Sequence, residues 1–307
     1  MDKKATMPEA AGAKRNTGMA KGYLFLVLFA FFVAWQTPFV TILQNHGVPA
    51  IGTVTMTFVV AAVLINLIDL VTGRIKTVYR EGRQHLKALL LMGALNFMGS
   101  IGLFSSVRTL DAGVAVALLY LSPVVICLFY FVTRLRPVSR HQWIAVAVCV
   151  TGCAMAVNVF QVAKGGLSVQ GVLFGILAAT CMGGYVMCND LLVPKDMDKW
   201  TAITFVLDVA ACLSIVVYPG MFEQFTGLSL LDIGIFIYVA GVTKIVCLHL
   251  MLAGTKIVGA ARSAVVQSME IPFTLLLAFV TLHQMLGPVE LFGVGLVILS
   301  VVLMQKQ

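Results

Sequence analysis

The residue best placed to do chemistry in this sequence is an acid inside an apolar segment. Glu270 lies two residues before Pro272, in an apolar run from about 260 to 281 that is long enough to cross a membrane. Ionisable groups inside a bilayer are costly and usually face a cavity or a partner. At 100° per residue, Glu270 shares one helical stripe with Ser263, Gln267, Thr274 and Thr281. The stripe predicts an inward-facing Glu270 that acts as a coupling-proton site or a counter-charge for a cation, or else forms a structural hydrogen bond, with Lys244 as a candidate partner.

Three further ionisable residues lie within apolar runs. Asp208 is near the middle of the run 200–220, where burial would raise its pKa, so it is a candidate proton carrier or a helix-to-helix contact. Lys244 and His249 share the run 230–253 but lie about 140° apart on an α-helix. His249 lies on the face of Tyr238 and can change charge near physiological pH, although the pattern favours a hydrogen-bonded core histidine.

Aromatic and amide side chains within the apolar runs are candidates for substrate contact. Aromatic rings that line a cavity can stack on a substrate or attract an ammonium group, and they can also simply pack. The candidate substrate-binding set is Trp35, Gln36, Asn96, Tyr120, Tyr185, Tyr238, His249, Gln267 and Glu270, with Glu270 and Asp208 as candidates for proton coupling.

Composition indicates a membrane protein without a cofactor. The 307 residues are 60% hydrophobic and 11% charged, whereas soluble domains carry about 25% charged residues. The net charge of +8 comes from Lys and Arg between apolar runs, which does not favour nucleic-acid binding. Phosphate-binding loops, His-Glu-x-x-His and Cys-x-x-Cys are absent, so neither a metal, a cofactor nor catalytic residues are predicted. A membrane enzyme or structural partner protein is the alternative from another class.

Hydropathy predicts an all-α protein with ten transmembrane helices. They are expected at about 22–43, 49–70, 87–107, 112–133, 141–160, 170–192, 200–220, 230–253, 260–281 and 288–305. Residues 1–21 are polar and predict a disordered tail. Most of the 21 Lys and Arg fall in the tail and alternate loops, which places both termini in the cytoplasm.

The sequence also contains an internal repeat. Tyr120-Leu-Ser-Pro123 and Met269-Glu-Ile-Pro272 place two prolines 149 residues apart, and each is followed by an apolar run, a turn and a Gly-containing segment. The repeats cover 22–160 and 170–305, with five spans each. Because five is odd, the halves must enter the membrane in opposite senses. Such inverted repeats build a binding site at the midplane between them.

These features resemble the drug/metabolite transporter superfamily, specifically its EamA-type ten-helix transporters. The resemblance rests on the span count, the duplication and two copies of a signature, Ala112–Val124 with Val138–Ala145, and Gly259–Phe273 with Leu286–Gly293. The turns Thr133–Arg136 and Leu282–Met285 lack the acid that family members usually carry there. The resemblance implies alternating access and a pocket formed chiefly by spans one, three, four, six, eight and nine. It implies no single substrate, since members carry amino acids, nucleotide conjugates, vitamins and amines.

The function predicted from the sequence is secondary active transport of a small polar organic metabolite. An amino acid or derivative is favoured, with a quaternary ammonium or other organic cation as the alternative. The predicted setting is the bacterial inner membrane. The expected partners are the substrate and the lipid bilayer, with protons as one candidate coupling ion and a homodimer left open.

Overall fold

The protein is helical throughout the part of the chain that the structure describes. The computed structural model describes residues 7–110, 112–159, 168–225, 227–282 and 287–305, and these ranges contain no strand. The helices of the first half are α1 (Met7–Ala34), α2 (Gln36–Asn45), α3 (Ala50–Val71), α4 (Ile75–Gln84), α5 (Leu86–Val107), α6 (Ala112–Leu119), α7 (Ser122–Thr133) and α8 (Arg140–Ala156). Those of the second half are α10 (Val169–Leu191), α11 (Lys199–Val217), α12 (Met221–Phe225), α13 (Leu230–Tyr238), the π-helix η2 (Val239–Val246), α14 (Cys247–Val258), α15 (Ala260–Gln267), α16 (Glu270–Leu282) and α17 (Pro288–Gln305).

These helices coincide with the apolar segments expected from the sequence. Six of them are long and apolar enough to cross a membrane among the described residues, the longest being the continuous stretch Leu230–Val258. Gly18–Ala34 and Pro288–Met304 are shorter apolar helices. One boundary differs, because α1 begins at Met7 and so extends into the segment predicted as a disordered tail.

Two membrane segments break at corresponding places in the two halves. The chain leaves the helix between α6 and α7 at Tyr120–Leu121, and between α15 and α16 at Ser268–Met269. A proline follows each break, Pro123 in the first turn of α7 and Pro272 in the first turn of α16. Proline is tolerated in the first turn of a helix but not in its interior, so it favours a new helix start there. The first break includes Tyr120, and Glu270 directly follows the second.

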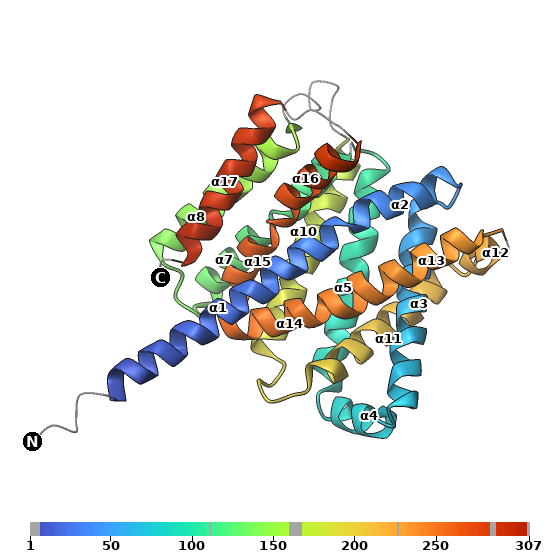
Figure 1. Cartoon of the computed structure of the whole chain (residues 1–307), viewed down its shortest axis with the longest axis horizontal. Coiled ribbons are helices and arrows are strands. Elements are labelled where there is room, and N and C mark those ends of the chain that lie inside the picture. Colours follow the sequence, from blue (N-terminus) through green and yellow to red (C-terminus); the bar gives the residue numbers. More distant parts are fainter. Residues whose placement is uncertain (1–6, 111, 160–167, 226, 283–286, 306–307) are drawn as a thin grey trace, which may run out of the picture.

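The helix contacts are reciprocal between the two halves: a helix of one half packs on the other half as its counterpart packs on the first. α1 packs on α14 in the same way that its counterpart α10 packs on α5, while α8 pairs with its own counterpart α17 and α3 with α11. Likewise, α10 contacts α6 and α7, and α1 contacts α15 and α16. Figure 1 shows α8 and α17 side by side at one end of the bundle and α3 at the other.

The basic loop after α3 contains a helix that hydropathy does not reveal. α4 lies across the end of the bundle (Figure 1) and buries Val78 and Gly82. A Cβ atom on Gly82 would lie 2.0 Å from the Phe205 ring of α11, so only glycine allows this approach. α4 is therefore a surface helix packed against α11.

Candidate functional site

Glu270 and Tyr120 meet between the two halves. The Tyr120 hydroxyl donates a hydrogen bond of 2.8 Å to the Glu270 Oε2 atom. Glu270 is the first residue of α16 and Tyr120 directly follows α6, so each lies at one of the two helix breaks. Tyr120 is buried and Glu270 is partly accessible. Two of the sequence-predicted site residues are thus in direct contact, and they join the two repeats.

Lys244 provides a positive charge in the same region. Its Nζ atom lies 4.5 Å from the centroid of the Phe58 ring, a cation–π contact with α3. Lys244 and Glu270 are both partly buried, and no direct ion pair joins them. An ammonium and a carboxylate therefore lie in one interior region, each held by an aromatic residue from the first half.

A π-helix carries Lys244, and the sequence analysis did not foresee it. η2 interrupts the segment 230–258 over Val239–Val246. Inserted π-turns change the helical period and frequently occur at functional sites. In the corresponding place of the first half, α5 is an uninterrupted α-helix with Leu95 where Lys244 stands in the second. The two halves therefore contribute different chemistry to the centre of the protein.

The remaining predicted residues lie on several helices and make contacts of their own. Trp35 occupies the break between α1 and α2, and Gln36 begins α2. Tyr238 ends α13, and its ring lies 4.8 Å from the Phe39 ring of α2. Gln267 is buried and donates to the Ser263 hydroxyl at 2.9 Å. This contact stays within α15, so substrate binding by Gln267 remains a prediction.

Tyr185 of α10 has an unusual environment. Its side chain is 0% exposed, and its hydroxyl has no hydrogen-bond partner among the described residues. Asn96 of α5 is also buried and lies close by. A buried hydroxyl without a partner costs about 1–3 kcal/mol, so such groups call for an explanation. The pair lies at the α5–α10 interface, where the sequence placed two candidate substrate contacts.

Asp208 lies in a different cluster from Glu270. Its carboxylate accepts hydrogen bonds of 2.6 Å from Asn66 of α3 and of 2.6 Å from the Tyr79 hydroxyl of α4. Burial and the neighbouring Asp208 carboxylate raise the pKa of Tyr79, so the phenol stays protonated and donates. The structure thus supplies the helix-to-helix contact that was the alternative to proton coupling.

His249 lies at the surface of the helix bundle, and its role as a substrate contact stays a prediction. It is exposed and borders a groove of about 560 Å³ with Leu64, Ile68 and Trp200. The angular argument assumed a regular α-helix from Tyr238 onward, and η2 breaks that period.

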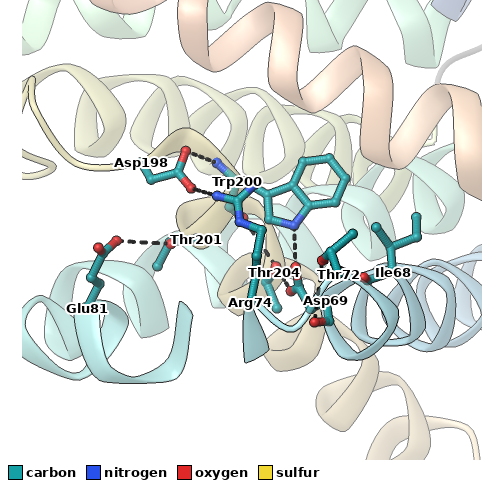
Figure 2. A network of polar contacts seen from close by, with 9 residues as sticks. All are labelled: Ile68, Asp69, Thr72, Arg74, Glu81, Asp198, Trp200, Thr201 and Thr204. Carbon is teal, nitrogen blue, oxygen red and sulfur yellow. Dashed lines mark hydrogen bonds and ion pairs between the residues drawn. The ribbon is translucent and has the colours of Figure 1, made fainter. Parts of the chain in front are cut away.

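Asp69 lies near the end of a predicted span, yet it is buried and paired. Asp69 of α3 accepts a hydrogen bond of 2.5 Å from the Trp200 indole and one of 3.0 Å from Thr204, both on α11. Figure 2 shows these contacts beside the ion pair between Arg74 and Asp198. Helix packing therefore covers this acid, although it lies near a helix end.

Asp190 joins the halves on the other side of the bundle. Its carboxylate pairs with Arg136 at 2.8 Å and accepts hydrogen bonds from the Tyr130 hydroxyl at 3.1 Å and the Ala260 amide at 3.2 Å. Arg136 and Tyr130 belong to the first half and Ala260 begins α15 of the second. The Asp190 carboxylate thus lies at the N-terminus of α15, where the helix dipole stabilises a negative charge.

These features define an all-helical membrane protein whose two related halves enclose a polar centre, and no group of residues that could hold a metal is present in the described ranges. The chain belongs to the EamA-like transporter family, which matches residues 20–158 and again 169–305. This membership confirms the resemblance to the drug/metabolite transporter superfamily and makes the protein a multi-pass membrane transporter of small molecules.

Comparison with solved structures shows the same fold. One structure, described only as "Crystal structure of protein", is 15% identical to this chain, with a TM-score of 0.73. The match covers 94% of this chain and 96% of the other. No curated protein matches the sequence.

Proposed function

We propose that this protein is a secondary transporter of a small zwitterionic metabolite, an amino acid or a derivative of one. The observation that carries the proposal is the placement of Glu270 and Lys244. They supply opposite charges in one interior region without pairing to each other. A substrate ammonium group would bind Glu270 and its carboxylate would bind Lys244. Such a ligand would satisfy both charges, which are costly when left alone inside a membrane.

We further propose ten spans arranged as two inverted repeats that alternate in access. Support comes from the exchange of helix contacts between the halves and from the two equivalent helix breaks. Each half supplies one member of the Tyr120–Glu270 pair, so rocking one half against the other would remodel the site. The distribution of Lys and Arg supports cytoplasmic termini in a bacterial inner membrane.

Transport in proteoliposomes tests the substrate class. Radiolabelled amino acids are offered to the purified protein, and uptake is compared with empty vesicles. Glu270→Gln should reduce uptake to background, because it removes the counter-charge for the ammonium group. Lys76→Gln serves as the control, since Lys76 is exposed on α4 and is not among the candidate site residues. Wild-type uptake by Glu270→Gln would contradict the proposal.

Lys244 distinguishes zwitterions from cations. In the wild type, a transported amino acid should inhibit radiolabelled uptake at a concentration roughly tenfold or more lower than the corresponding amine that lacks the carboxylate. Lys244→Gln should remove this preference. Inhibition by choline-like compounds but not by zwitterions would instead favour the organic-cation alternative, with Glu270 as counter-charge and the Tyr120 and Tyr238 rings as contacts. Proton coupling predicts that an imposed pH gradient drives uptake in the wild type and that dissipating the gradient removes this stimulation.

A further inference from the structure

A cavity lies at the corner where α4 turns into α5. It has a volume of about 620 Å³, is half open, and extends to the end of α10. The lining residues are Arg83, Gln84, His85, Leu86, Lys87, Ala88, Leu91 and Leu192. It is separate from the region of Glu270, which lies on other helices.

One part of the cavity wall is cationic. Arg83 and Lys87 are exposed, and neither forms an ion pair within the described part of the chain. His85 lies between them in sequence, and none of the lining residues is acidic. The cavity therefore offers two uncompensated positive charges to an anion.

The other part of the wall is apolar and faces outward. Leu91 is 45% exposed and Leu192 is 51% exposed, and Leu86 at the mouth is exposed as well. Leu91 lies on α5, one of the helices long enough to cross a membrane. This wall would meet acyl chains, whereas the cations at the start of α5 would lie near lipid headgroups.

The basic corner is held in a fixed place. Gly82 packs against Phe205, and the Tyr79 hydroxyl hydrogen-bonds the Asp208 carboxylate at 2.6 Å. Thr201 of α11 also donates to Glu81 at 3.4 Å. These contacts fix the end of α4 against α11, so the backbone that carries Arg83 and His85 is positioned before any ligand binds.

We propose that this cavity binds one anionic phospholipid, with its phosphate on Arg83 and Lys87 and an acyl chain against Leu91 and Leu192. A neutral lipid would leave the two charges without a partner, and a soluble anion would leave the apolar wall uncovered. Basic pockets between helices at the membrane surface are suited to anionic headgroups. The proposal needs the protein to reside in a membrane, but it does not depend on which substrate is transported.

Lipid titration of the purified full-length protein tests this site. Delipidated protein is titrated with phosphatidylglycerol or phosphatidylcholine, and bound lipids are counted by native mass spectrometry. The wild type should bind phosphatidylglycerol roughly tenfold or more tighter than phosphatidylcholine. The double variant Arg83→Gln/Lys87→Gln should lose this preference. The matched control is Lys76→Gln/Arg80→Gln, which removes the same charge from exposed positions of α4 outside the cavity and should keep the preference.

Two further arms separate a lipid from a soluble anion. Leu91→Ser should weaken phosphatidylglycerol binding although it leaves the charges in place. Glycerol phosphate, which has the anionic group but no acyl chain, should compete poorly. Equal losses in both double variants, no preference in the wild type, or full competition by glycerol phosphate would each overturn the proposal. Arg83→Lys keeps the charge at an exposed position and should retain binding, which guards against a folding defect in the glutamine variants.

Discussion

At the scale of single residues, the polar groups in the membrane segments fall into two kinds. Asp69, Asp190 and Asp208 are satisfied by donors from neighbouring helices and hold those helices together. Glu270 and Lys244 are instead held mainly by aromatic residues and interact with each other only at longer range. This difference separates groups used for packing from groups available to a ligand.

The Tyr120 hydroxyl should matter for substrate affinity. Tyr120→Phe keeps the ring but removes the donor to Glu270. Hydrogen bonds to charged groups contribute about 1.5–3 kcal/mol. If the carboxylate must be held in place to meet the substrate, we expect KM in proteoliposomes to rise roughly tenfold or more while expression stays normal. An unchanged KM would show that Glu270 is positioned without Tyr120.

Removal of the Tyr185 hydroxyl should leave the protein at least as stable as the wild type. This hydroxyl is fully buried and lacks a partner among the described residues, so Tyr185→Phe removes an uncompensated polar group at nearly constant volume. We expect the Tm of the detergent-solubilised protein to stay level or rise, with a gain of about 1 kcal/mol. Tyr130→Phe is the comparison, because the Tyr130 hydroxyl does donate to Asp190, and it should lower the Tm. A clear fall for Tyr185→Phe would mean that a water or a substrate normally satisfies this hydroxyl.

At the scale of helices, much of the fold follows from the sequence. Apolar runs predict where the long helices lie, and Pro123 and Pro272 mark two of the breaks, because proline permits a helix start but not an interior position. The π-helix η2 has no such marker, since Val239–Val246 contains no proline and reads as ordinary apolar sequence. Likewise, α4 was hidden within a basic loop because its buried face consists only of Val78 and Gly82.

The pairing of α8 with α17 depends on glycine. A Cβ atom on Gly293 would lie 2.3 Å from the Ala156 amide nitrogen and 2.7 Å from the Gly152 carbonyl oxygen. Backbone atoms cannot move aside as a side chain can, so Gly293→Ala must separate the two helices. We expect a loss of about 1–3 kcal/mol, seen as a lower Tm in detergent. Gly295→Ala on the same helix meets nothing within 4 Å and should leave the Tm unchanged. Similar values for both variants would contradict the close packing.

At the scale of the whole molecule, polar contacts join the halves at two distant places. His46 at the end of α2 pairs with Asp232 of α13 at 2.6 Å, and Asp190 pairs with Arg136 near the start of α15. Figure 1 shows the α2–α13 end and the α7–α15 end well apart. In the proposed topology these contacts lie on opposite faces of the membrane. Alternating access would then require that they open in turn, because opening both together would let the substrate leak.

The inverted arrangement itself can be tested by chemical labelling. Asn45 follows the first membrane segment, and a shift of 149 residues leads to position 194, beside Lys195 after the sixth. Both Asn45 and Lys195 are exposed. Inverted halves place these related positions on opposite faces, whereas parallel halves would place them on the same face. We therefore expect Asn45→Cys to react with a membrane-impermeant maleimide in intact cells and Lys195→Cys to react only after permeabilisation.

The labelling variants are made in a Cys212→Ser protein, because Cys212 is the one exposed cysteine and the other six are buried. Arg134→Cys provides a second cytoplasmic marker within the first half, since Arg134 is exposed after α7. Labelling of Asn45→Cys and Lys195→Cys from the same side of the membrane would contradict the inverted orientation of the two repeats. Alternating access by two inverted halves would then need another explanation, whereas the contact between Tyr120 and Glu270 would stand.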